Sequence, residues 1–342
     1  GDGNTLVVNS QLTEPGVALG LESNATVDVD TAQTFGGLSG TSTNATLDVT
    51  DAGITLQQED DTTYLGSFSG GSTITKQGSG NLILDQAVAA ALNANQIDVT
   101  AGGFGVDTPS VNVAYSAVDD AFDQSNATEE IDFTKGGSGT LTLDVANDWN
   151  GNTKVSGGTL QLNVNLDTPG IKGADSAARI NLNGGNITVG GPTNSSDNLT
   201  PDDTFVGTVT GTGNITKDGA STQELTGEND FDGVVDVNEG TLVMNFVDKA
   251  TNMVTAQDDT EFGFKTPDTS GITFAGELNG PSPGNGQAVL SQRGEGNIKL
   301  NEDLINGNWL LRIAAGDDLG KILDSSGNPI TDLDVDIDSG AI

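Results

Sequence analysis

Apolar and polar residues alternate over short stretches along most of the chain. Leu141 and Leu143 flank Thr142, and Ile180 and Leu182 recur in the same way further on. Alternation over a few residues predicts half-buried β-strands. Glycine, asparagine, aspartate and threonine separate these stretches and limit each strand to about three to six residues. Strands this short cannot bury their own apolar faces, so the pattern predicts that they stack on one another.

One stretch has a different pattern. Residues 86–95 read QAVAAALNAN, and runs of alanine and leucine favour a helix over a strand. We expect a short helix beside the stacked strands.

The strands recur at a regular spacing. NATVD at residues 24–28 returns as NATLD at residues 44–48, an offset of 20, which is typical of one rung of a β-solenoid. The offset of 59 from Lys76 to Lys135 is close to three rungs, and the offset of 82 from Lys135 to Lys217 is close to four. These spacings predict a coil of about 12 to 16 rungs. The residues expected to point into its core are Leu143, Leu160, Leu162, Leu182 and Leu242.

A longer pattern occurs at residues 134–163 and 216–245, and its opening half occurs near residues 70–86. It begins with Lys-x-Gly, continues through a Leu-x-Leu strand, turns at an aromatic residue and glycine, and closes with Gly-Thr-Leu. The matching positions of the second unit are Lys135, Gly137, Gly139, Leu141, Leu143, Trp149, Gly151, Val155, Gly158, Thr159 and Leu160. Those of the third unit are Lys217, Gly219, Leu225, Asn229, Phe231, Gly233, Val235, Gly240, Thr241 and Leu242. Trp149 and Phe231 are expected to cover the edge of the tube.

This pattern resembles the autotransporter-associated β-strand repeat of large exported surface proteins from Gram-negative and related bacteria. The resemblance implies an all-β chain that forms a right-handed parallel β-helix. It also implies an extracellular or cell-surface location for the mature, exported form. It does not imply an activity, because this fold carries adhesins, proteases and inert stalks alike.

Charge and composition narrow the classes of partner and chemistry. The chain has 49 acidic and 12 basic residues, a formal charge of −37, and no cysteine or histidine. Such a charge repels nucleic acid and anionic membranes, so we expect neither as a partner. No apolar run approaches the roughly 18 residues of a membrane span, so we also expect no membrane insertion. Without cysteine and histidine, thiolate nucleophiles, imidazole bases and the common zinc ligands are missing. The three arginines, Arg179, Arg293 and Arg312, form no recognisable catalytic pattern, so the sequence predicts a non-catalytic protein.

Acidic pairs are the candidate metal ligands. We predict no cofactor and assign no metal site, although carboxylates in turns are the oxygen ligands that calcium prefers. Solvated loop carboxylates are the favoured interpretation of these pairs. They are Asp60 and Asp61, Asp119 and Asp120, Asp202 and Asp203, Asp258 and Asp259, and Asp317 and Asp318.

The amino-acid composition of the sequence changes near its C-terminal end. Residues 276–287 read GELNGPSPGNGQ, a break rich in proline and glycine. We therefore expect a β-solenoid over residues 1–275. Residues 276–342 are expected to form modified terminal rungs or a small cap or assembly region.

Both ends of the chain carry strand-like segments with one apolar side. Leu6, Val8 and Leu12 share a face near the start, and Leu333, Val335 and Ile337 share one near the end. Open strand edges are templates for further pairing, so these six residues are the predicted assembly interface. Head-to-tail or donor-strand contacts would then give a homopolymer. In the alternative, each strand folds back to complete its own rod.

Two main functions remain open. The first is a structural subunit of a surface fibre, sheath or matrix, favoured by the aromatic content of 4%. The second is an adhesin passenger that presents a glycan-binding or other ligand-binding patch on a rod. A polysaccharide-active β-helix enzyme is a third, less favoured alternative.

Overall fold

The alternating stretches form short parallel β-strands that stack into a solenoid of about 12 turns. The predicted parallel β-helix is therefore confirmed. The residues that this computed structural model describes are 5–10, 17–93, 96–107, 112–115, 122–123, 131–144, 149, 151–172, 178–189, 204–248, 250–265, 271–293, 297–313, 322–324, 326–328 and 334–337.

Successive rungs are in register at the predicted spacing. Val27 lies opposite Leu47 in neighbouring parallel strands, which confirms the 20-residue offset between NATVD and NATLD. Parallel strands in register place the same faces above one another. Apolar residues therefore form continuous columns inside the coil.

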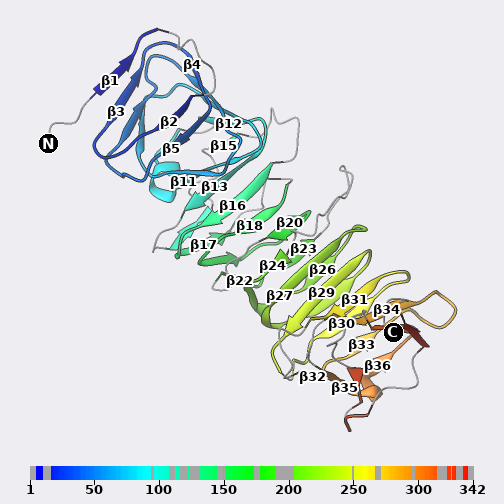
Figure 1. Ribbon diagram of the computed structural model, residues 1–342. Helices are drawn as coiled ribbons and strands as arrows, with labels where there is room; N and C mark the ends of the chain where they lie inside the picture. The colour runs from blue at the N-terminus through cyan, green and yellow to red at the C-terminus, as the bar shows by residue number, and fades with distance from the viewer. Residues whose placement is uncertain are drawn as a thin grey trace. The chain divides into compact units, whose positions relative to one another are not determined.

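The chain divides into two compact units, of which the first is Gly1–Leu160 (Figure 1). Its strands stack in sheets that the chain visits in turn. One stack contains β1 (Thr5–Val8), β3 (Thr26–Val29), β6 (Thr46–Asp48) and β9 (Ser67–Ser69). β14 (Asn112–Ala114) and β17 (Thr140–Leu143) pair in a separate sheet. A second stack contains β4 (Gln33–Phe35), β7 (Ile54–Gln57), β10 (Ile74–Gln77), β12 (Ile97–Val99) and β15 (Phe122–Asp123). The third contains β8 (Thr62–Tyr64), β11 (Asn81–Asp85), β13 (Gly103–Asp107), β16 (Asp132–Gly136) and β18 (Thr153–Val155). β2 (Ala18–Gly20) pairs with β5 (Gly37–Ser39), and the helix α1 (Gln86–Ala89) follows β11.

The second unit, Gln161–Ile342, repeats this organisation. β19 (Thr159–Leu162) crosses the boundary between the units, and β21 (Ile171–Lys172) follows it. The longest stack contains β22 (Arg179–Asn183), β25 (Thr208–Thr212), β27 (Thr222–Asp232), β29 (Thr241–Phe246), β31 (Glu261–Phe264), β34 (Ala288–Gln292), β37 (Trp309–Ile313) and β39 (Asp334–Ile337), and β24 (Thr204–Phe205) pairs with β27. Another contains β20 (Leu166–Thr168), β23 (Ile187–Val189), β26 (Ile215–Lys217), β28 (Val234–Val237), β30 (Met253–Ala256), β33 (Leu278–Asn279) and β36 (Ile305–Asn306). β32 (Ile272–Phe274), β35 (Ile298–Leu300) and β38 (Ile322–Leu323) form the third, and a 3-10 turn spans Glu302–Leu304.

The core of each unit is a column of leucine, isoleucine, valine and aromatic side chains. All five leucines predicted to point inward are fully buried. Trp149 and Phe231 do not cover an edge as expected, because they are buried too. Trp149 stacks on Phe133 with 4.2 Å between ring centroids, and its Nε1 donates to Thr153 Oγ1 at 2.9 Å. The aromatic corner of the repeat therefore fills the tube.

The opening lysine of each repeat is buried as well. Lys76, Lys135 and Lys217 have no exposed surface. Lys76 Nζ donates to the carbonyl oxygens of Gln77 and Gly78, both at 2.9 Å, and to that of Ala101 at 3.0 Å. An ammonium group has three donors and needs three acceptors when it leaves water. The lysine therefore fastens its own turn to the turn one rung further along the chain.

The glycine two places after each lysine makes this arrangement possible. Gly78, Gly137 and Gly219 have φ angles of 81°, 68° and 72°, a left-handed conformation that glycine adopts without steric cost. This conformation is the physical reason for Lys-x-Gly in the repeat.

The predicted number of rungs between Lys76 and Lys135 is wrong. Lys76 lies opposite Val99 in the stack that contains β10, whereas Lys135 lies opposite Val106 in the stack that contains β13. The offset of 59 residues is therefore not a whole number of rungs. The Lys-x-Gly turn suits more than one corner of the coil, so the repeat does not start at a fixed corner.

Candidate functional site

The N-terminal part of the predicted assembly interface lies on a strand that has one edge unpaired among the described strands. β1 ends its sheet, with β3 as its neighbour, and Leu6 and Val7 are 59% and 46% exposed. Leu6 is the first residue of a column of apolar residues in register that continues through Val27 and Leu47. Val8 is half-buried, and Leu12 lies outside the described residues. The strand therefore presents an apolar residue where a further rung would bury it.

The C-terminal part of the predicted interface belongs to the last strand of the other unit. β39 pairs in parallel with β37 of its own chain, so that Val335 lies opposite Leu311 and Ile337 opposite Ile313. Leu333 lies outside the described residues. This pairing is the arrangement of the alternative in which the strand completes its own rod. Assembly through these six residues stays a prediction.

Two of the three arginines converge on one buried carboxylate. Glu261 Oε1 accepts from Arg293 Nη2 at 2.5 Å, and Glu261 Oε2 accepts from Arg312 Nη1 at 3.1 Å. Ser291 Oγ also donates to Glu261, but Ser291 is buried, with 1% of its surface exposed. The cluster ties β31, β34 and β37 together, with Glu261 and Ser291 buried and the side chains of Arg293 and Arg312 32% and 37% exposed.

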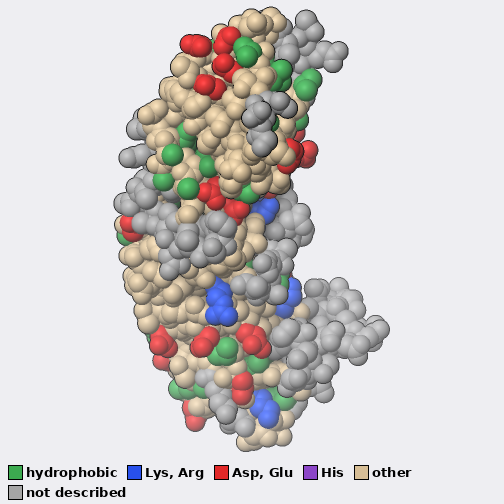
Figure 2. Space-filling model, turned by 90° about the vertical axis from the view of Figure 1, so that its left-hand side faces the viewer, with side chains coloured by type: hydrophobic (Ala, Val, Ile, Leu, Met, Phe, Trp, Pro, Cys, Tyr) green, Lys and Arg blue, Asp and Glu red, His purple; other side chains and the backbone are tan. Residues whose placement is uncertain are grey.

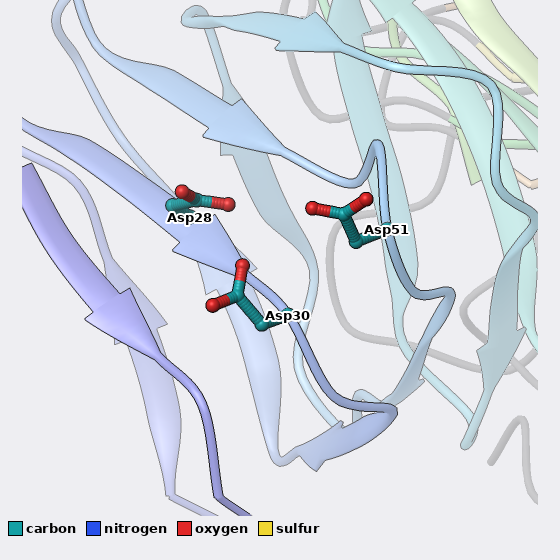
Figure 3. Close-up of side chains that lie close together, drawn as sticks. All are labelled: Asp28, Asp30 and Asp51. Atoms are coloured by element: carbon teal, nitrogen blue, oxygen red, sulfur yellow. The ribbon is translucent and has the colours of Figure 1, made fainter.

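Three carboxylates gather on the surface of the first unit. Oxygens of Asp28, Asp30 and Asp51 all lie within 4.8 Å of one another, and Figure 3 shows the three groups pointing toward a common point. Desolvation, followed by the charges of Asp30, Asp48 and Asp51, raises the pKa of Asp28. Calcium takes six to eight oxygen ligands, and this cluster supplies three residues. Calcium binding at acidic turns therefore stays a prediction.

In each acidic pair that the structure describes, one carboxylate accepts hydrogen bonds from a neighbouring turn of the coil. Asp61 accepts from the backbone N–H and the side-chain amide of Asn81, at 2.9 and 2.8 Å. Asp258 Oδ1 accepts from the N–H of Gln287 at 2.8 Å. The pairs at 119–120, 202–203 and 317–318 lie outside the described residues.

The helix α1 takes the place of a strand in the first stack. Thr5, Thr26, Thr46 and Ser67 occupy one column of this stack, in register. Their spacing puts the next member near residue 88, within α1. Asp85 begins the helix by accepting a hydrogen bond from the N–H of Ala87 at 2.8 Å. The stack is therefore interrupted immediately after β9.

This interruption gives β9 one paired edge and one open edge. The Ser67 N–H donates to Ala45 O at 2.8 Å, and Ser69 O accepts from the N–H of Val49 at 2.9 Å. Successive residues of a strand direct their backbone groups to opposite sides. The N–H and C=O of Phe68 therefore face away from β6, and none of the described strands pairs with this edge.

A groove of about 260 Å³ lies between β9 and α1. Leu65, Phe68, Val88 and Leu92 form its apolar wall, and all four are partly exposed. Asp85 also lines the groove, and the exposed Ala91 lies at its rim. A wall of apolar groups beside an open strand edge and a carboxylate is suited to binding a ligand with both apolar and cationic groups.

The sequence pattern missed this groove and the buried lysines. It predicted a helix at residues 86–95, and α1 is present over four of them. It did not predict that the helix replaces a rung. The signal was available, because the 20-residue spacing places a strand where QAVA stands.

Acidic residues outnumber basic ones in the chain, 49 to 12. Figure 2 shows carboxylates spread over the visible face, with few lysine or arginine side chains and with hydrophobic side chains mostly single. No helix among the described residues has the length and apolar character needed to cross a membrane.

Comparison with known proteins agrees with this architecture. The passenger-associated-transport-repeat family matches at residues 133–162 and 215–244, the two long repeats of the sequence. The adhesin BmaC autotransporter of Brucella suis biovar 1 (strain 1330) is 31% identical over 192 residues. That match covers 50% of this chain and 5% of the Brucella protein. No solved structure matched the chain. The two long repeats are therefore similar to the passenger-associated transport repeat, and half of the chain is similar to a short part of an autotransporter.

Proposed function

We propose that this chain is a non-catalytic section of an adhesin passenger, displayed at the bacterial surface as a rod that carries a binding surface. The similarity to an autotransporter adhesin over half of the chain is the observation that carries this proposal. The stacked core supports it, because a ladder of short rungs yields a stiff scaffold on which loops and grooves are held in place.

The proposal is tested by attachment of the folded chain. Beads coated with the purified chain are applied to host cells, matrix proteins and a glycan panel, and bound beads are counted. Beads coated with the Leu160→Asp variant serve as the control, because this change disrupts the core at a fully buried position. The proposal predicts attachment by the parent chain that this variant loses. Equal counts for both coatings on every surface would contradict it.

A fibre subunit is the second candidate, favoured by the open edge of β1 with its exposed Leu6. Head-to-tail contacts would bury Leu6 and Val8 of one copy against Val335 and Ile337 of the next. The charge of −37 makes copies repel one another, so assembly should strengthen as salt screens this repulsion. Electron microscopy and sedimentation across a sodium chloride series test this candidate, with Leu6→Asp and deletion of residues 333–342 as the variants. Monomers under all conditions would contradict it.

A further inference from the structure

The groove between β9 and α1 has features that neither stacking nor the repeat explains. Its wall is apolar, and its lining includes Phe68 of β9, whose outer backbone edge pairs with none of the described strands. Buried strand edges normally pair with another strand, and open ones are templates for an added strand. Several sheets of the coil end within it, but at β9 the end of the sheet coincides with a groove.

We propose that this groove binds an extended, basic peptide segment of a partner protein, which adds a strand to β9 and inserts one apolar side chain. This inference rests on the proposed adhesive function and names the class of partner. Main-chain pairing supplies affinity in such strand addition, and pockets for alternate side chains supply specificity.

The size of the groove fits one anchoring side chain. About 260 Å³ is less than the roughly 300–1,000 Å³ of sites for drug-sized ligands. A phenylalanine or leucine side chain would lie between the ring of Phe68 and the helix residues Val88 and Leu92. Phe68 is itself held by an edge-on contact with the buried ring of Tyr64, with 5.0 Å between centroids, so this wall is already in place before a ligand arrives.

The negative charge of the chain favours a basic peptide over an acidic peptide or a second copy of the chain. Asp85, whose carboxylate also caps α1, lines the groove, and the chain as a whole carries a charge of −37. A second copy of this chain or an acidic peptide is repelled, whereas a lysine or arginine next to the anchoring side chain is attracted both at long range and at Asp85.

The test uses a blocked peptide in which threonines alternate with lysine, phenylalanine and lysine, so that the last three share one face. Binding to the purified chain is measured by fluorescence anisotropy and amide exchange. We expect saturable binding that slows hydrogen exchange of the Phe68 amide. Glycine in place of the phenylalanine, or glutamate in place of the lysines, should weaken binding by about ten-fold or more, since burial of an aromatic side chain contributes at least that factor.

Two variants of the chain locate the binding to the groove. Ala91→Trp places a large side chain at its rim, and Ala90→Trp places the same side chain at an exposed neighbouring position that does not line the groove. Ala91→Trp should weaken peptide binding by about ten-fold or more, and Ala90→Trp by less than about two-fold. Absence of peptide binding at millimolar concentration, or equal binding by both variants, would overturn the inference.

The bead assay separates this inference from the proposed function. If the beads attach but the groove binds no peptide, the proposed adhesive function is supported and the inference about the groove is overturned. Peptide binding by a chain that attaches to no surface supports the groove and contradicts the adhesin proposal.

Discussion

Lys135 Nζ donates a hydrogen bond to the carbonyl oxygen of Gly157, 22 residues further along the chain and 3.1 Å away. Its other acceptors are the carbonyl oxygens of Gly136 and Gly137 in its own turn. Two turns that are distant in sequence are thus joined by one ammonium group. The interaction explains why a charged residue opens a repeat whose other positions are apolar or small.

Replacing this lysine with an apolar residue should destabilise the first unit. Lys135→Met removes all three hydrogen bonds and leaves buried carbonyl oxygens without this donor, at a cost of roughly 3 kcal/mol. Urea unfolding followed by circular dichroism measures the change. Lys154→Met is the matched control, because Lys154 pairs with Asp61 on the surface, with 43% and 38% of the side chains exposed. Such pairs contribute about 0–1 kcal/mol. Equal losses in the two variants would contradict the role of the buried lysine.

The buried lysines also predict how stability depends on pH. Burial lowers the pKa of both Lys76 and Lys135 from 10.5 to about 8. Between about pH 8 and pH 10.5 these two lysines hold more protons in the unfolded chain than in the folded chain. The free energy of unfolding should therefore rise as pH increases from about 8 toward 10.5. Below pH 8 the lysines are charged in both states, and this gain is absent.

Thermal unfolding of the parent and of a Lys76→Met, Lys135→Met double variant at pH 7.5 and 10 tests this dependence. The parent should gain stability relative to the double variant as pH rises, because the remaining titrating groups are common to both. A constant difference between the two proteins across this range would contradict the prediction.

Two glycines allow the cost of backbone strain to be measured apart from the cost of a steric clash. Gly158 and Gly184 both have positive φ, at 60° and 86°. A Cβ at Gly158 would lie 2.3 Å from Gly139 O, whereas a Cβ at Gly184 would have no neighbour within 4 Å. Gly184→Ala should cost about 1–2 kcal/mol from conformation alone, and Gly158→Ala several kcal/mol more. Measured free energies of unfolding that are alike for both variants would show that the rungs can move apart.

The inward face of the repeat is tested by two adjacent substitutions. Leu160 is fully buried, and its neighbour Gln161 is half-buried on the other face of β19. Leu160→Asp buries an unpaired carboxylate and should cost several kcal/mol, while Gln161→Asp should cost less than about 1 kcal/mol. Hydrogen exchange followed by mass spectrometry should show lost protection in several rungs around Leu160. Unchanged protection in that variant would contradict the inward assignment.

The alternation of residues predicted the strands and their buried faces because a period of two determines which side chains share a face. Leu143 and Leu182 follow this rule. Lys135 could not be placed in the same way, since lysine is almost never fully buried without a partner. Its partners are backbone carbonyls, which the sequence does not display. The recurring glycine two positions later was the available signal.

Contacts between rungs were also hidden from sequence analysis. Asp28 and Asp51 are 23 residues apart and meet only because one rung separates them. The groove at Phe68 arises because α1 stands where a strand is expected, a difference that appears only when rungs are aligned by their register. Trp149 was expected at an edge because large aromatic residues suit such places, but the corner of the tube has room for its ring against Phe133.

The most direct test of the central claim, that this chain is a folded section of an adhesin, is competition for attachment. Bacteria engineered to display this chain on their surface are applied to a surface to which they adhere, after that surface has been incubated with increasing concentrations of the purified chain. The account predicts saturable, concentration-dependent loss of attachment with the folded parent chain and no loss with Leu160→Asp. Undiminished attachment at concentrations at which the chain coats the surface, or equal inhibition by both proteins, would contradict it.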